Sequence, residues 1–295
     1  MAIDPEDLPA WSEAFLAADR LARTAGISRV DREWAWGGAT GKGVRVAIVD
    51  SGVEGSHPAV RGRLGESVAV RIDKNGDPEV VKDNGQDLYG HATACAGIIL
   101  GLAPEAEIVS VRVLNEELKG KGAAFARGLE WAIEQGVQVA NLSLSSKSDA
   151  MYGLFHELAD EAYFHNVALI SAANNIAEAS YPSLFSSVFS VAAHAEPDPW
   201  RFYYNPNPPV EFGAWGVDVP MAWKDGSDVV ATGNSFAAPH IAGLVALIIS
   251  KHPGLTPFEL KAILAAVANN PRHDDPAPAT KPSPVGKAKK KRKKG

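Results

Sequence analysis

The alternation of strand-like and helix-like segments through the middle of the chain is the feature that most restricts its fold. Buried strands are predicted at 44–49, 108–114, 137–144, 167–172 and 188–193. Helical segments lie between them at 91–100, 123–135 and 150–166. Strands that are joined through helices form right-handed crossovers and therefore a parallel sheet. We predict an α/β fold of three layers, in which a mainly parallel central sheet carries helices on both faces.

Two more helices are predicted after the last of these strands. The segment 235–250 is apolar nearly all round, so we expect it to be buried in the middle of the domain. The last helix has clear start signals, because Thr256 suits the N-cap, Pro257 suits the first helical position and Glu259 completes a capping box.

The composition changes near residue 270. Five prolines lie between 271 and 285, and seven lysines and arginines follow between 287 and 294. We predict an N-terminal extension over 1–35, one folded domain over 36–270, and a Pro-rich linker with a basic disordered tail over 271–295. A helix is predicted at 11–24 of the extension. No apolar run approaches the roughly 20 residues that span a bilayer, so we expect no membrane span.

The charge of the folded part argues against a nucleic-acid partner. The chain has 29 basic and 35 acidic residues, and its formal net charge is −6. Without the seven basic residues of the tail, 22 basic residues remain against 35 acidic ones, a net charge of −13. An acidic body repels phosphate backbones, so we expect no specific binding of nucleic acid.

Cysteine usage and the start of the chain favour a cytoplasmic location. Cys95 is the one cysteine, so no internal disulfide can form. Residues 1–9 contain neither the basic nor the apolar region of a secretory signal. A free thiol is typical of reducing compartments, and we therefore expect a cytoplasmic protein. The sequence leaves the oligomeric state open.

Three short segments contain residue types that nucleophilic catalysis uses. Asp50 ends the first predicted strand, at the edge of a parallel sheet where ligand sites form, although Asp-Ser-Gly is also common in turns. His91 begins a helix among small residues, where a structural histidine is the simpler interpretation. Ser235 opens the buried helix, either as an N-cap or as a nucleophile near the positive end of the helix dipole. Each segment alone is a weak signal.

The order of the three residues is more specific than any one of them. His91 follows Asp50 by 41 residues, and Ser235 follows His91 by 144. The chain order Asp, His, Ser is that of subtilisin and differs from the orders of chymotrypsin and the α/β-hydrolases. The blocks DSG at 50–52, HAT at 91–93 and NSFAAPH at 234–240 resemble the catalytic blocks of the subtilases, the subtilisin-like serine proteases.

The resemblance covers about residues 36–268. It implies a serine endopeptidase that hydrolyses peptide bonds in peptide or protein substrates through an acyl-enzyme intermediate. It also implies that Ser235 is the nucleophile, that His91 transfers the proton and that Asp50 orients the imidazole. This chemistry requires no cofactor. Cys95, four residues after His91, resembles a cysteine of the proteinase K branch of the family.

A fourth block, AANN at 172–175, resembles the family segment whose asparagine stabilises the oxyanion. The resemblance implies this role for Asn175. A fixed amide N–H of this kind stabilises the charged tetrahedral intermediate, and in subtilisin it is worth about 10²–10³ in turnover. The alternative is an ordinary turn, because asparagine tolerates left-handed backbone geometry.

The segment 141–146 resembles the family strand that pairs with the substrate backbone. This implies substrate contacts from Ser143, Leu144 and Ser145, since an added strand contributes main-chain hydrogen bonds. An ordinary buried strand is the alternative. Ile176 stands where some relatives have a charged residue, so we expect an apolar side chain before the scissile bond.

Four segments depart from the family pattern. Ala92 replaces a glycine and adds a methyl group beside His91. Asn234 replaces the usual threonine before the nucleophile, which we expect to alter local hydrogen bonding. Asn174 replaces a glycine, and we expect a left-handed backbone there. Ser145 and Ser146 replace two glycines, which narrows the groove on the side before the cut.

A structural calcium ion and two other functions stay open at this level. A polar stretch offers oxygen ligands of the kind that calcium prefers: Asp73, Asn75, Asp77, Asp83, Asn84 and Asp87. A solvated charged loop explains the same residues. The chain is alternatively a protease or transpeptidase for one dedicated precursor peptide, or a non-catalytic module that binds peptides on the same fold.

Overall fold

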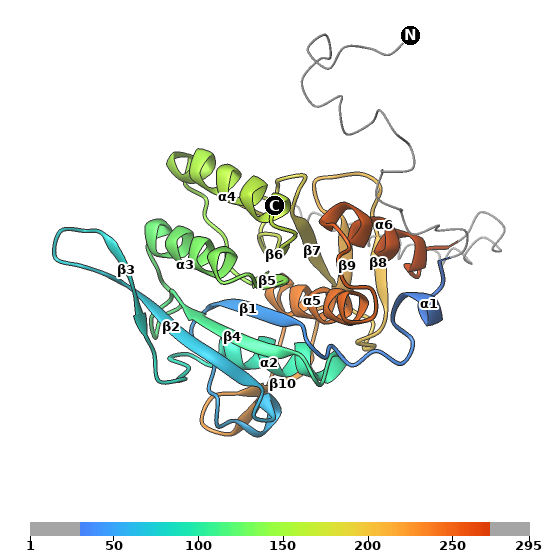
Figure 1. Ribbon diagram of the computed structural model, residues 1–295, viewed down its shortest axis with the longest axis horizontal. Helices are drawn as coiled ribbons and strands as arrows, with labels where there is room; N and C mark the ends of the chain where they lie inside the picture. Colours follow the sequence, from blue (N-terminus) through green and yellow to red (C-terminus); the bar gives the residue numbers. More distant parts are fainter. Residues whose placement is uncertain (1–29, 272–295) are drawn as a thin grey trace, which may run out of the picture.

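The computed structural model describes residues 30–271, and a nine-stranded sheet forms its centre (Figure 1). The strand order is β3-β2-β4-β1-β5-β6-β7-β9-β8. The strands are β1 Arg45–Asp50, β2 Leu64–Ile72, β3 Pro78–Lys82, β4 Glu107–Arg112, β5 Val139–Leu142, β6 Ala168–Ala172, β7 Phe189–His194, β8 Phe202–Tyr204 and β9 Phe212–Trp215. All neighbours from β2 to β9 pair in parallel, and the edge strands β3 and β8 pair antiparallel. The predicted, mainly parallel sheet is confirmed.

Helices cover both faces of this sheet. The helices are α1 Arg32–Trp36, α2 His91–Leu102, α3 Gly122–Glu134, α4 Tyr152–Phe164, α5 Asn234–Lys251 and α6 Pro257–Val267. Successive side chains of a strand point to opposite faces. In β1, Val46 and Ile48 therefore pack in the core that contains α2, α5 and α6, whereas Ala47 and Val49 pack in the core that contains α3 and α4. The predicted three layers are present.

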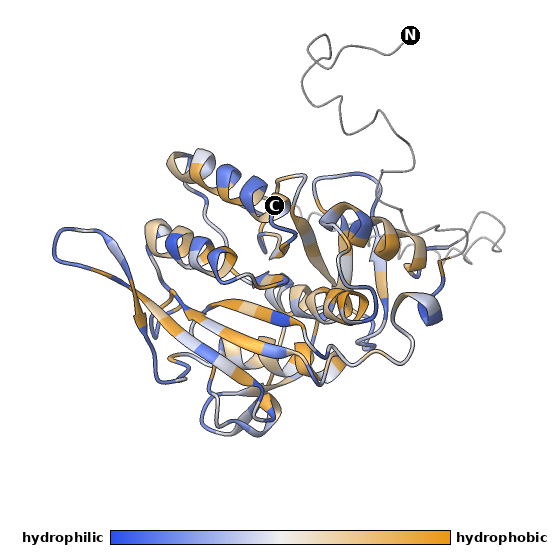
Figure 2. Cartoon of the chain, viewed as in Figure 1, coloured by the Kyte–Doolittle hydropathy of each residue, from blue (hydrophilic) through white to orange (hydrophobic). Residues whose placement is uncertain are grey.

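Helix α5 lies in the middle of the domain. All residues from Phe236 to Ile249 are buried, and the hydropathy colouring in Figure 2 shows mostly apolar residues along this helix. It contacts the neighbouring helix α2 and four strands of the sheet, β5, β6, β7 and β9. The prediction that this segment is central is correct. Its first turn contains Ser235, so a rigid, buried element carries this side chain.

The capping signals of the last helix are also confirmed. Thr256 Oγ1 accepts a hydrogen bond from the backbone N–H of Glu259, and the Glu259 side chain accepts one from the backbone N–H of Thr256. These reciprocal bonds satisfy two donors that a helix start otherwise leaves free. Helix α6 begins at Pro257, as its sequence predicts.

Several boundaries and elements differ from the sequence prediction. The helix predicted at 150–166 is a 3-10 turn, η4 Asp149–Met151, followed by α4. The strand predicted at 137–144 is limited to β5, Val139–Leu142. Strands β2, β3, β8 and β9 were not predicted, nor was the separate hairpin of β10 Val219–Trp223 and β11 Ser227–Ala231. Another short 3-10 helix, η3, spans Pro58–Val60.

Only part of the predicted domain organisation falls within the described residues. Helix α1 spans the predicted boundary at residue 36, and the ring of Trp34 stacks on His252, next to the end of α5. The helix predicted at 11–24 and nearly all of the predicted linker and basic tail lie outside the described residues. Within residues 30–271, no helix has both the length and the apolar character that a membrane span requires.

Candidate active site

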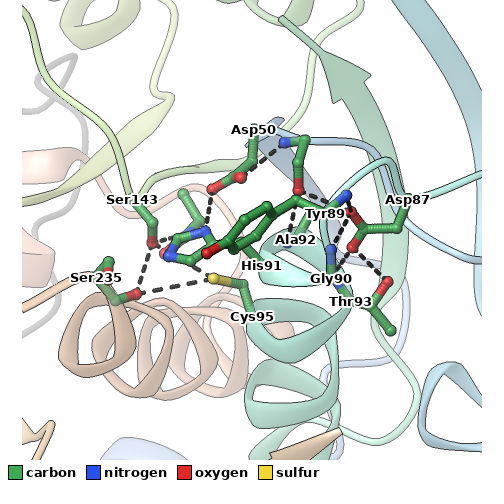
Figure 3. A network of polar contacts seen from close by, with 12 residues as sticks. Asp50, Asp87, Tyr89, Gly90, His91, Ala92, Thr93, Cys95, Ser143 and Ser235 are labelled. Carbon is green, nitrogen blue, oxygen red and sulfur yellow. Dashed lines mark hydrogen bonds and ion pairs between the residues drawn. The ribbon is translucent and has the colours of Figure 1, made fainter. Parts of the chain in front are cut away.

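Asp50 and His91 form a buried pair at the carboxyl end of the sheet. Asp50 is the last residue of β1 and His91 is the first residue of α2. The Asp50 Oδ2 to His91 Nδ1 distance is 2.8 Å, and the Asp50 side chain is fully buried. Because a carboxylate accepts and cannot donate, Nδ1 carries the proton and Nε2 is left as the basic atom. Figure 3 shows this pair beside the start of α5.

The charges around His91 set its basicity. Burial lowers the pKa of His91, but the charge of Asp50, the hydrogen bond to Asp50 and the charge of Asp87 raise it by more. The net effect is a pKa above the ordinary value of 6.5. An imidazolium that forms when His91 accepts a proton is therefore stabilised by two nearby carboxylates.

A carboxylate that the sequence analysis grouped with calcium ligands holds the start of α2. Asp87 accepts five hydrogen bonds of 2.7–2.9 Å, and the donors are Ser51 Oγ, Tyr89 N, Gly90 N, Thr93 N and Thr93 Oγ1. Asp87 thus satisfies free N–H groups at the helix start and complements the helix dipole. Its position four residues before His91 was an available signal that the sequence analysis missed.

Ser235 lies at the first turn of α5, next to the Asp50–His91 pair. Its carbonyl oxygen accepts a 2.8 Å hydrogen bond from Ser143 Oγ, and Cys95 Sγ lies 3.8 Å from the same oxygen. The ring of the next residue, Phe236, has its centroid 5.1 Å from that of His91. Within the described residues 30–271, the Ser235 hydroxyl and His91 are not hydrogen-bonded to each other. Such bonds often tighten only when substrate binds.

Cys95 is one helical turn after His91 and faces the same site. Its thiol is fully buried, and its sulfur, the Asp50 carboxylate and a ring nitrogen of His91 lie within 4.8 Å of one another. Burial raises the pKa of Cys95 well above its usual range, with the charge of Asp50 adding to the effect. The thiol therefore stays protonated at neutral pH and acts as a packing residue.

Asn175 lies beside the residue that precedes Ser235. Its Oδ1 accepts a 2.9 Å hydrogen bond from the backbone N–H of Asn234. With the oxygen held in this way, the amide nitrogen of Asn175 is the group left to donate. Asn174 does not have the expected left-handed backbone, because it is not among the non-glycine residues with positive φ. Its side-chain Oδ1 accepts from Ile176 N at 3.2 Å, so a side-chain hydrogen bond shapes this turn.

The segment 143–146 leads from β5 along the edge of the site. Ser143 is buried, and its hydroxyl binds Ser235 O and accepts from Asn141 Nδ2, so only its backbone is free for a substrate. Leu144 and Ser145 line a cavity of about 320 Å³ that also contacts α3. Ser146 pairs with Tyr181 through two backbone hydrogen bonds of 2.8 and 2.9 Å. Ile176 is 53% exposed, so its apolar side chain is open to a ligand.

The carboxylates of the predicted calcium stretch do not converge. Asp83 forms two hydrogen bonds to Arg112, Asp73 accepts from the backbone of its own turn, and Asp87 holds α2. A metal site needs at least three ligand side chains close together. Within residues 30–271, no residue of this stretch belongs to such a cluster of acidic, histidine or cysteine side chains. The polar residues there serve local structure.

Comparisons with known proteins agree with this fold and site. The Subtilase family profile matches residues 41–287. An intracellular serine protease of Paenibacillus polymyxa is 30% identical over 239 residues, which are 76% of this chain and 72% of that one. Subtilisin BL of Lederbergia lenta is 32% identical over 257 residues, 83% and 91% of the two chains. A solved structure of a cold-adapted subtilisin-like serine proteinase has a TM-score of 0.61 at 28% identity, and covers 77% and 83%.

A parallel α/β fold, with a buried Asp–His pair beside a serine at a helix start, defines the class of serine hydrolases. The chain belongs to the subtilase family, and its activity is that of a serine endopeptidase. The predicted membership in the subtilase family is therefore confirmed, whereas the likeness of Cys95 to the proteinase K branch stays a prediction.

Proposed function

We propose that Asp50, His91 and Ser235 are the catalytic triad of this peptidase. The observation that supports the proposal most directly is the 2.8 Å contact between the buried Asp50 carboxylate and His91 Nδ1, which leaves Nε2 free to accept a proton. Ser235 lies at the first turn of the neighbouring helix, near its positive end. The three residues come from three elements that the core holds rigidly, as an efficient site requires.

The reaction then proceeds by acyl transfer. Ser235 Oγ attacks the peptide carbonyl carbon, and His91 Nε2 takes the hydroxyl proton. The tetrahedral oxyanion accepts hydrogen bonds from the Asn175 side-chain amide and from the Ser235 backbone N–H. When the intermediate collapses, the C–N bond breaks and His91 donates its proton to the leaving amine. Water, activated by the same histidine, hydrolyses the acyl-enzyme and restores Ser235.

We place the substrate along the segment 143–146. The backbone of Ser143, Leu144 and Ser145 binds the residues before the scissile bond as an added strand. Ile176 and the cavity beside Leu144 favour apolar side chains in these residues. The Ser146–Tyr181 pairing closes the far end of this segment, which limits the length that a strand-like substrate can occupy.

Two further assignments accompany this function. We propose a cytoplasmic location, which the single free cysteine and the similarity to an intracellular serine protease support. A structural calcium ion on the stretch 73–87 stays a prediction of the sequence, and its ligands would have to be found beside the existing bonds of Asp83 and Asp87. The chemistry itself uses side chains, one backbone N–H and water, and requires no cofactor.

The test is digestion of a peptide library by the wild type, by Ser235→Ala and by Ser227→Ala. Ser227 is an exposed serine of the β10–β11 hairpin and serves as the matched control. We expect Ser235→Ala to lose roughly 10⁶-fold in kcat, the magnitude of the same removal in subtilisin, while Ser227→Ala cuts like the wild type. A fluorophosphonate should label both active proteins and leave Ser235→Ala unlabelled. Equal cutting by all three proteins would contradict the triad, and cutting of a single sequence would indicate a dedicated precursor.

A further inference from the structure

Asn234, the residue before the proposed nucleophile, uses every polar atom of its side chain. Its Oδ1 accepts a 2.8 Å hydrogen bond from Ala193 N, and its Nδ2 donates to Ala173 O and to Asn174 O, each at 3.1 Å. Its own backbone N–H donates to Asn175 Oδ1. All three side-chain hydrogen bonds of Asn234 go to residues outside its own helix.

The partners of Asn234 lie on two neighbouring strands. Ala173 and Asn174 directly follow β6, and Ala193 is part of β7. These strands pair in parallel, and Ala173 N also donates to Val191 O in β7 at 2.8 Å. One side-chain amide therefore joins the start of α5 to the carboxyl ends of both strands. The loop that carries Asn175 is fixed to the helix that carries Ser235.

We propose that Asn234 is a positioning residue for the oxyanion hole. The inference rests on the proposed role of Asn175. The hole needs two donors, on separate segments, at about 2.7–3.1 Å from one oxygen atom. Asn234 sets the distance between these segments, because its side chain binds the loop and its backbone N–H orients the Asn175 amide. A displacement of about 1 Å in such a site can cost roughly 10²-fold in rate.

The chemistry of asparagine is specific to this task. Two backbone carbonyls need two donors and one backbone N–H needs an acceptor, and a side-chain amide offers all of them in one plane. The threonine that is usual in the family has a single hydroxyl proton and can satisfy one of the carbonyls at most. Because Asn234 binds the backbone carbonyl of Asn174, this contact does not depend on the side chain at position 174.

The test is a double-mutant cycle between Asn234→Ala and Asn175→Ala, read as kcat and KM on a peptide that the wild type cleaves. We expect Asn234→Ala to lower kcat by roughly 30- to 100-fold and to change KM less than threefold, because ground-state binding uses other segments. Asn175→Ala alone should lose about 10²–10³ in kcat. In that background, Asn234→Ala should cost less than about threefold more, since nothing remains to be positioned.

Two further variants separate positioning from general stability. Asn205 is an exposed loop residue whose Nδ2 likewise donates to two carbonyls, those of Asn207 and Val210, so Asn205→Ala removes a similar set of bonds far from the proposed donors. It should leave kcat unchanged. Asn234→Thr, the milder replacement, should fold like the wild type and lose an intermediate share of kcat.

The outcomes distinguish this inference from the function on which it rests. If the kcat loss of the double variant equals the product of the two single losses, the positioning role is wrong. It is also wrong if Asn234→Ala changes KM alone. A kcat loss in Asn205→Ala equal to that in Asn234→Ala would also overturn it. If Asn175→Ala retains full kcat, both the oxyanion assignment and the positioning role are wrong. Absence of wild-type turnover would contradict the proposed function itself.

Discussion

At the scale of single residues, the proposed triad predicts that the protonation of His91 sets the pH range in which Ser235 can react. Burial lowers the pKa of this imidazole, and the nearby carboxylates of Asp50 and Asp87 raise it above 6.5 on balance. A general base must be neutral to accept a proton. As the pH falls through the raised pKa, the imidazole becomes charged and the rate falls, so the acid limb of the pH profile lies above 6.5.

The measurement is kcat/KM between pH 5 and pH 9 for the wild type and Asp50→Asn. Without the Asp50 carboxylate, burial is the largest effect on the pKa of His91 and lowers it. The midpoint of the acid limb should therefore move to lower pH. The rate itself should fall by about 10⁴-fold, as it does in trypsin when the equivalent aspartate is changed. His165→Gln, on the exposed end of α4, is the control with an unchanged profile. A wild-type midpoint at or below pH 6.5, or the same midpoint in both proteins, would refute this reasoning.

The proposed catalytic residues could be predicted from the sequence, whereas the residues that support them could not. The order of Asp50, His91 and Ser235, each within a family-like block, can be read from the sequence without a structure. The role of Asp87 at the start of α2 was not predicted, because it lies in a stretch with five other Asp and Asn residues and composition does not tell which carboxylate is buried. The Asn234 contacts depend on two strands and a helix that are far apart in the chain, so no local pattern predicts them.

At the scale of elements, the start of α2 depends on one carboxylate. Asp87→Ala removes the acceptor of five hydrogen bonds, most of them from groups that water reaches poorly. Each buried donor left without a partner costs about 1–3 kcal/mol. We expect the free energy of unfolding to fall by at least about 2 kcal/mol in urea titrations, and kcat to fall because His91 is the first residue of this helix.

Asp160→Ala is the control for this prediction, because it removes an exposed carboxylate from α4. Its effect should stay within about 0.5 kcal/mol, as for most surface substitutions. An Asp87 variant as stable and as active as the control would show that the hydrogen bonds to Asp87 do not hold the helix start.

The sequence predicts buried elements better than partly exposed ones. The five predicted strands were recognisable because both of their faces are covered, which produces continuous apolar runs. Strands β3 and β11 contain only exposed and half-buried residues over five positions each, so they lack the continuous apolar run of a buried strand. The N-terminal boundary of α6 was predicted correctly because a capping box is a local interaction between residues 256 and 259.

At the scale of the whole molecule, the active site exists only when the central sheet is complete. The proposed triad joins the end of β1, the start of α2 and the start of α5, which are separated by up to 185 residues of chain. Helices α2 and α5 pack on each other in one continuous core. We therefore expect fluorophosphonate labelling of Ser235 and tryptophan fluorescence to be lost at the same urea concentration.

A cleft that opens before the core unfolds would give a different result. Labelling would then disappear at lower urea than the fluorescence change, as happens where a site has lower local stability than the domain. Measurement of both signals on the same samples decides between the two. The surface variant Asp160→Ala should follow the wild type in both signals.

The burial of α5 has a consequence for self-digestion, the cleavage of one enzyme molecule by another. A peptidase in concentrated solution is also a substrate for its neighbours, and nicks arise where the backbone is accessible, in exposed loops. The helix that carries the proposed nucleophile is buried over Phe236–Ile249, so we expect it to be shielded from such cuts. We therefore expect cleavage to accumulate in exposed loops while the buried helix stays intact and the enzyme stays active.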